Sequence, residues 1–232
     1  MYPISFVEAV RFELENQNDL LDVIHDSLLA YEDKLENQEF PWDPDNMTDE
    51  DDIQYNKYID IFSCVLGSFP GRLYSNYVIG WYSFIEDMLI QLCKEMNLNL
   101  SIDIDYHDGF DKGIWRAKKF LEDGAGYKIN EIHWRTLSEI NKVRNHIVHK
   151  RGLFVFSNDK PENVQAVEIG PENTKVFIHI SQIFYNYLQK HGIFGLNLGS
   201  YSIVPTYEYC KYLNNFADEL FSKLFLDLGL VE

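Results

Sequence analysis

Residues 74–96 limit most strongly how this chain can fold, because they are apolar on nearly every side. The stretch reads YSNYVIGWYSFIEDMLIQLCKEM. A helix that is hydrophobic all round has to be covered by other elements, so the pattern predicts a central buried helix. Glu86 and Asp87 interrupt the run, which leaves it shorter than a membrane span.

The segments around this helix are mostly helical as well. Apolar residues recur at three- and four-residue intervals from about residue 5 to residue 36, and the same rhythm predicts helices over about 53–66, 110–122, 130–151 and 206–228. We expect the acidic segment 36–52 to be an exposed loop and the sequence GSFPG, residues 67–71, to break the chain between two helices. β-branched alternation on either side of GPEN predicts a two-stranded hairpin over about 163–180. The expected fold is therefore mainly α, a helical bundle with a small β-hairpin inserted before the C-terminal helices.

Length and composition favour one domain over residues 1–232. With 46% hydrophobic residues, the chain is long enough to bury a sizeable core. Its three cysteines, Cys64, Cys93 and Cys210, lie far apart in apolar segments, so we expect buried thiols in a reducing compartment. The N-terminal residues lack a basic leader. These features predict a soluble, cytoplasmic protein without a membrane partner.

The charge of the chain is unevenly distributed. The formal net charge is -17, yet residues 112–151 hold ten basic side chains against four acidic ones. A polyanion would be attracted to this basic sector and repelled by the rest of the molecule. The alternative is that these cations only solvate the polar faces of two helices.

The most informative stretch is KVRNHIVHKRG, residues 142–152, at the end of the helix expected from Asn130. On this helix Arg144 falls in the middle of an apolar stripe, and a desolvated guanidinium needs an anion nearby. The stripe consists of Leu137, Ile140, Val143, Ile147 and Val148. One partner could be Glu86 on the central helix, in a buried ion pair. The other explanation is that Arg144 and His149 border a cleft that a phosphate enters, and the two explanations are compatible.

His146 and His149 form a His-x-x-His pair at helical spacing. No third histidine, cysteine or acid lies close to them in the sequence, so we expect no zinc site and no other cofactor.

Arg144, Asn145, three further residues and then His149 resemble the Arg-polar-spacer-His signature of HEPN domains, a helical superfamily rich in ribonucleases. The apolar helix carrying Glu86 followed by the motif helix is also the order found in that family. The resemblance covers about residues 74–152 and implies a HEPN-like core over about 53–152, completed by the C-terminal helix 206–228.

The resemblance implies a metal-independent endoribonuclease of the toxin or antiviral-defence type. Two copies of the chain would pack their motif helices together into one composite site, with RNA as substrate and an antitoxin or another defence protein as a further partner. Arg144 would hold and polarise the scissile phosphate, His149 would assist proton transfer, and Asn145 would orient the phosphate or the histidine.

Five further residues belong to the expected site. We expect His146 and Glu86 to support the site, and Lys142, Lys150 and Arg151 to contact RNA.

One feature departs from part of the family. Members controlled by a nucleotidyltransferase antitoxin often carry a tyrosine two residues after the histidine, where this chain has Arg151. Control by modification of that tyrosine is therefore not expected. The alternative function is a non-catalytic HEPN-like module that binds RNA, a nucleotide or another protein.

Overall fold

The computed structural model describes residues 5–37, 47–100, 113–158, 166–169, 176–197 and 200–231, and it is mainly helical. The long helices are α1 (Phe6–Glu36), α2 (Asp49–Ser63), α3 (Phe69–Leu100), α5 (Glu131–Lys150) and α7 (Tyr207–Asp227). Shorter helices are α4 (Ile114–Lys119) and α6 (Gln182–Lys190), and two π-helical turns lie at Cys64–Ser68 and Phe120–Gly124. The predicted fold class is confirmed.

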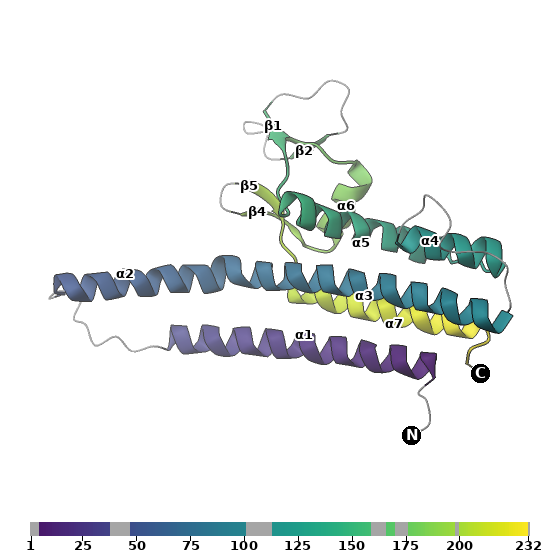
Figure 1. Cartoon of the computed structure of the whole chain (residues 1–232). Helices are drawn as coiled ribbons and strands as arrows, with labels where there is room; N and C mark the ends of the chain where they lie inside the picture. Colours follow the sequence, from purple (N-terminus) through teal and green to yellow (C-terminus); the bar gives the residue numbers. More distant parts are fainter. Residues whose placement is uncertain are drawn as a thin grey trace.

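Helix α3 occupies the centre of the bundle, as its apolar sequence predicted. Its side chains at Trp81, Ile85, Leu89 and Leu92 are fully buried. Helices α1 and α7 pack against one side of α3, and α4 and α5 lie along another side (Figure 1). Because each neighbour contributes an apolar face, α3 is shielded from water along most of its length.

The predicted break at GSFPG is wrong. The chain passes from α2 through the π-helical turn Cys64–Ser68 directly into α3, so that α2 and α3 form one long rod (Figure 1). The amide of Phe69 donates to the carbonyl of Cys64, five residues earlier. Proline lacks an N–H and its ring crowds the carbonyl four residues before it, and the wider π-turn before Pro70 accommodates both effects without ending the helix.

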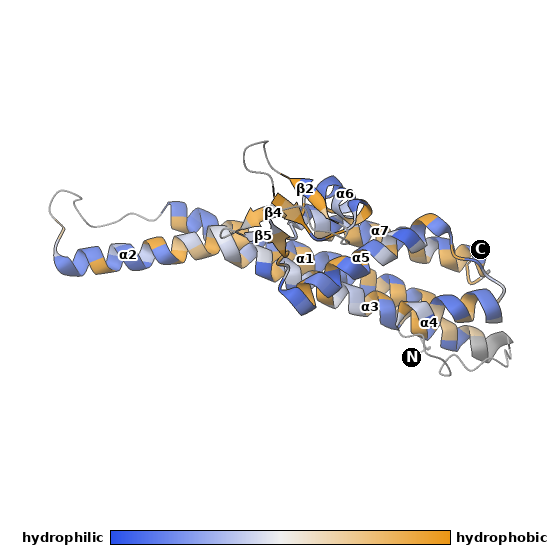
Figure 2. Ribbon diagram, turned by 90° about the horizontal axis from the view of Figure 1, so that it is seen from above, coloured by the Kyte–Doolittle hydropathy of each residue, from blue (hydrophilic) through white to orange (hydrophobic). Residues whose placement is uncertain are grey.

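Helix α2 extends beyond the bundle (Figure 2) and buries none of its residues. It begins at Asp49, inside the segment 36–52 that was expected to be a loop, because Thr48 and Asp51 form a capping box. Residues 38–46 of that segment lie outside the described residues. Cys64 follows α2 and is exposed, which contradicts the prediction that it is buried, whereas Cys93 and Cys210 are buried.

The β-structure is more extensive than predicted. Strands β2 (Val167–Ile169) and β3 (Val176–Ile178) pair antiparallel within the predicted hairpin, and β1 (Phe156–Ser157) pairs with the other edge of β3. A second hairpin of β4 (Phe194–Asn197) and β5 (Ser200–Ile203) follows α6. Helix α6 and this second hairpin were not predicted, and they cover the C-terminal end of α5 (Figure 1).

No helix among the described residues is both long enough and apolar enough to cross a membrane.

Candidate functional site

The end of α5 is fixed tightly against β5. Asn130 caps the start of α5 by accepting from the amide of Ile132 at 2.8 Å, and the helix ends at Arg151 in the left-handed conformation. The amide of Ile203 donates to the carbonyl of Gly152 at 2.8 Å. Gly152 has φ +76°, and a Cβ atom there would lie 2.9 Å from the carbonyl oxygen of Ile203. Glycine therefore permits the close approach that positions the motif helix.

Arg144 is half-buried between α5 and α3. Its Nη1 donates to Oδ1 of Asn145 at 2.8 Å, and its Cζ lies 5.9 Å from the centre of the Tyr82 ring. Its Nε is buried and has no hydrogen-bond partner in the described part of the chain. The side-chain Nδ2 of Asn145 donates in turn to Oδ1 of Asn141 at 3.1 Å. These two hydrogen bonds hold the arginine on one side along α5.

Glu86 does not form the ion pair that we considered for Arg144. Both residues are described, and no bridge shorter than 4.0 Å joins them. The Glu86 carboxylate instead lies against Gly113, where an added Cβ atom would be 2.9 Å from Oε1. Burial raises the pKa of the Tyr82 phenol, the charge of Glu86 raises it further, and the charge of Arg144 lowers it. The charges of Glu86 and Arg144 therefore both act on the Tyr82 phenol, although these two residues form no bond with each other.

His146 is a structural residue in this arrangement. Its Nε2 lies 2.9 Å from the carbonyl oxygen of Leu153, which can only accept, so this nitrogen carries the proton. The ring packs 4.1 Å from that of Phe154, centre to centre. Burial lowers the pKa of His146 to about 4. The side chain is thus neutral near pH 7 and ties the segment after α5 back to the helix.

His149 and Lys150 are exposed, and neither side chain has a hydrogen bond or an ion pair within the described ranges. Five residues separate Arg144 from His149, which on a helix places the two side chains about 140° apart. A single chain therefore does not bring these two predicted catalytic residues together. Val148, expected on the buried stripe, is 41% exposed, because β5 and α3 leave that turn of the helix partly uncovered.

Lys142 has a local partner. Its Nζ lies 2.7 Å from Oε1 of Glu139, whose side chain is only 8% exposed, and 5.9 Å from the centre of the Phe184 ring. Farther along the basic sector, Lys118 and Lys128 pair with Glu122 and Glu131. At the C-terminal end of α5, Arg144, Lys150 and Arg151 form no ion pair with any described residue, so unpaired positive charge gathers there.

The described residues contain no group of three histidine, cysteine, aspartate or glutamate side chains that could hold a metal ion.

Sequence reasoning missed Arg72, which lies on α3 and lines a pocket together with Arg151. The sequence GSFPG just before it predicts a break between two helices. The only signal in the sequence was an arginine placed seven residues before Ile79 and ten before Tyr82, at helical spacing on the face that meets α5.

Comparisons with known proteins add no relationship: no family model, no curated protein and no solved structure matches this chain.

Proposed function

We propose that this protein is a HEPN-like endoribonuclease that cleaves RNA without a metal ion, at a site shared between two copies of the chain. The observation that carries the proposal is the state of Arg144. Arg144 is half-buried, and among the described residues its buried Nε has no partner and its guanidinium no acid, an arrangement that is costly unless an anion binds there. A phosphodiester is an anion that a planar guanidinium binds well.

The chemistry of the proposed reaction matches these residues. Attack by a 2'-hydroxyl on the adjacent phosphorus needs positive charge at the phosphoryl oxygens and a group that accepts a proton. Arg144 supplies the charge, with Asn145 holding its Nη1 at 2.8 Å. His149 is exposed, without a bonded partner among the described residues, and its side-chain type exchanges protons near neutral pH. The 2'-oxygen displaces the 5'-oxygen, which leaves with a proton, and the product is a 2',3'-cyclic phosphate.

The shared site follows from the separation of the two residues on α5. Because Arg144 and His149 diverge by about 140° on one helix, two-fold packing of α5 against α5 would bring Arg144 of one copy toward His149 of the other. Lys150 is exposed on the same helix without an ion pair among the described residues and would contact the RNA backbone, whereas Lys142 is already paired with Glu139.

A direct test incubates the purified chain with RNA in excess EDTA and analyses the products on a denaturing gel. We expect cleavage that leaves 2',3'-cyclic or 3'-phosphate ends, no cleavage of the same sequence made of DNA, and loss of activity in Arg144→Ala and in His149→Ala. Arg11→Ala, which removes an exposed cation from α1, is the matched control and should cleave like the wild type. Activity that requires a divalent ion, or full activity in either α5 variant, would contradict the proposal.

A second candidate function rests on a different surface. An apolar groove of about 590 Å³ lies between α1 and the junction of α2 with α3, and it is lined by Val23, Tyr31, Ile61 and Phe69 among others. These four side chains are 43–62% exposed, which is unusual for a cluster of large apolar residues. Such a surface suits a non-catalytic module that binds another protein. A wild-type chain that cleaves no RNA but is retained by a partner through this groove would favour that function.

A further inference from the structure

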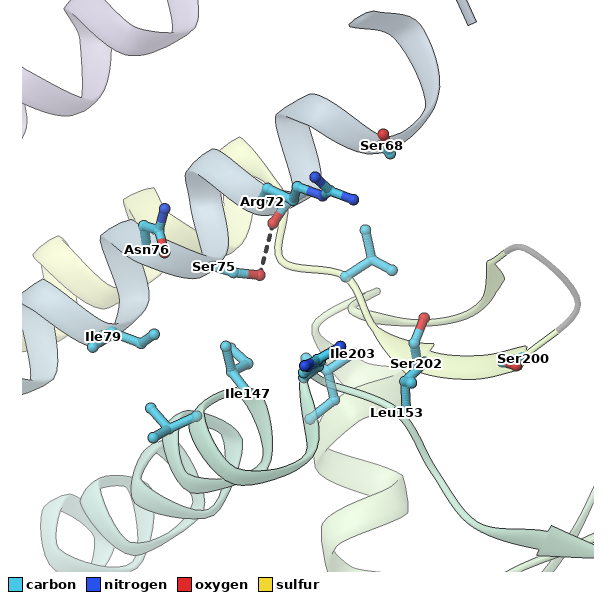
Figure 3. Close-up of a pocket in the computed structure, with 14 residues that line it drawn as sticks. Ser68, Arg72, Ser75, Asn76, Ile79, Ile147, Leu153, Ser200, Ser202 and Ile203 are labelled. Carbon is cyan, nitrogen blue, oxygen red and sulfur yellow. Dashed lines mark hydrogen bonds between the residues drawn. The ribbon is translucent and has the colours of Figure 1, made fainter. Parts of the chain in front are cut away.

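A pocket of about 870 Å³ lies between α3, the C-terminal end of α5 and strand β5. Figure 3 shows Arg72 and Ser75 on α3, Ile147 on α5, and Ser202 and Ile203 on β5 around this space. Its volume is within the range typical of sites for small ligands. Neither Arg144 nor His149 lines it, so the pocket is separate from the proposed catalytic residues.

The charge of the pocket is opposite to that of the chain. The protein has 37 acidic residues and 20 basic ones, yet the described lining contains two arginines, Arg72 and Arg151, and no carboxylate. Neither guanidinium forms a hydrogen bond or an ion pair with any other described residue. Two cations that share a cavity repel each other, and an anion between them would remove that repulsion.

Arg151 occupies its position at a conformational cost. It has φ +55°, and it is the one described residue other than glycine with a positive φ. An arginine there is less favourable than glycine or asparagine, which usually end helices in this way. A contribution to ligand binding would explain why a long cationic side chain stands at this position.

Ser202 provides an independent observation. Its side chain is part of the pocket lining, the residue is only 4% exposed, and its Oγ has no hydrogen-bond partner among the described residues. A buried hydroxyl without a partner is destabilising. An oxygen of a bound ligand would accept the hydrogen bond that the protein leaves unmade. The Oγ of Ser75 already donates to the carbonyl of Gly71 at 2.7 Å, so Ser202 is the better placed hydroxyl donor.

Much of the remaining lining is apolar. Ile79, Ile147, Val148, Leu153, Ile203 and Val204 cover much of the lining. A bare inorganic ion would leave these surfaces in water, whereas a ligand with an apolar body would bury them.

We propose that the pocket between α3, α5 and β5 binds an organic phosphate monoester. Arg72 and Arg151 hold the phosphate oxygens, Ser202 donates a hydrogen bond to one of them, and the organic group lies against the isoleucine wall. Arginine suits this role because its planar fork pairs with two phosphate oxygens at once. The proposal does not depend on RNA cleavage, because it uses none of the proposed catalytic residues.

Isothermal titration calorimetry with phenyl phosphate tests the proposal, with phenol and inorganic phosphate as partial ligands. We expect phenyl phosphate to bind more tightly than either of them. Arg72→Gln and Arg151→Asn should each weaken binding at least tenfold. Asparagine is chosen at residue 151 because it tolerates the left-handed conformation. Arg135→Ala removes an exposed cation elsewhere on α5 and should bind within twofold of the wild type.

Ser202→Ala separates a ligand contact from a structural role. Removing an unpartnered buried hydroxyl should leave the melting temperature unchanged or raise it, while phenyl phosphate binds severalfold more weakly. No binding by the wild type, or equal binding by the wild type and both arginine variants, would overturn the proposal.

Competition with a short DNA oligonucleotide, prepared in one form with a 5'-phosphate and in another with a 5'-hydroxyl, identifies the source of the monoester. Displacement of phenyl phosphate only by the 5'-phosphorylated oligonucleotide would support the end of a nucleic-acid strand as ligand. No displacement by either form would support a free small molecule. Equal displacement by the 5'-hydroxyl form would show that backbone phosphodiesters suffice, and it would overturn the monoester assignment.

Discussion

Nη1 of Arg144 donates to Oδ1 of Asn145 at 2.8 Å, so two consecutive residues of the motif hold each other on the surface of α5. This contact gives Asn145 a positioning role, since it fixes one end of the guanidinium while Nε stays buried without a partner.

Replacing Asn145 should therefore affect the reaction through Arg144. We expect Asn145→Ala to lower kcat for RNA cleavage about tenfold, with a smaller change in KM, because one hydrogen bond to a charged group contributes about 1.5 kcal/mol. Asn145→Gln keeps an uncharged amide carbonyl that can accept from Nη1 and should retain more activity than Asn145→Ala. Steady-state kinetics on a short RNA measure both values, and an Asn145→Ala variant with unchanged kcat would remove Asn145 from the site.

His146 gives the fold a pH dependence of its own. Its pKa is lowered to about 4 by burial, compared with an ordinary value of 6.5. Because the unfolded chain binds this proton more readily than the folded one, the stabilisation is fully present above pH 6.5 and is lost as the pH falls toward 4. Burial also lowers the pKa of His191 to about 4, so His191 adds to the loss of stability at low pH.

The corresponding variant is His146→Gln, which keeps a side-chain donor for the carbonyl of Leu153 but cannot take up a proton. We expect the free energy of unfolding to fall less between pH 7 and pH 4.5 in this variant than in the wild type. Urea denaturation at several pH values measures the difference. Identical pH profiles would mean that His146 does not titrate differently in the folded and unfolded chains.

Gly152 and Gly192 form a matched pair for testing the junction between α5 and β5. Both have positive φ, at +76° and +63°, but only at Gly152 would a Cβ atom meet another group, the carbonyl oxygen of Ile203 at 2.9 Å. Gly192→Ala should cost about 1 kcal/mol from backbone strain, and Gly152→Ala should cost more by about 1–3 kcal/mol because the contact with β5 must open. Equal losses in thermal or urea unfolding would show that the junction is not tightly packed.

The sequence predicted the elements that depend on long, regular patterns. The apolar run 74–96 forms the buried part of α3, and the helix predicted over about 206–228 is α7, which Thr206 caps and which buries Leu213 and Leu220. These predictions succeeded because burial follows directly from helical periodicity.

Prediction failed where the outcome depends on tertiary context. Gly67 and Pro70 indicate a break, but the π-helical turn carries the helix through them. Strands β4 and β5 are four residues each, too short for a pattern to emerge, and within the described part of the chain they pair with each other and with the segment after α5. Val148 follows the apolar spacing of its helix, yet it is left partly uncovered because it lines the pocket beside Arg151.

The candidate site likewise has a part that local sequence patterns predict and a part that depends on tertiary packing. The residues of the motif helix could be named from sequence because they are close together along the chain. The pocket could not be predicted, since Arg72 and Arg151 are 79 positions apart in the sequence. They line the same pocket only because α3, α5 and β5 pack together. The pairing of Lys142 with the buried Glu139, three residues away, also shows that a cation counted in the basic sector need not be available to RNA.

The claim that two copies of the chain share one site is tested most directly by mixing two inactive variants. Purified Arg144→Ala and His149→Ala are combined, allowed to exchange subunits, and assayed for cleavage of a fluorescent RNA. In the mixed dimer, Arg144 of one copy faces His149 of the other at one of the two sites. We expect activity that is absent from each variant alone to return in the mixture and to approach a quarter of the wild-type value when exchange is complete. A mixture that remains inactive would contradict the shared site, provided that energy transfer between differently labelled variants shows that mixed dimers have formed and the wild type cleaves the same RNA.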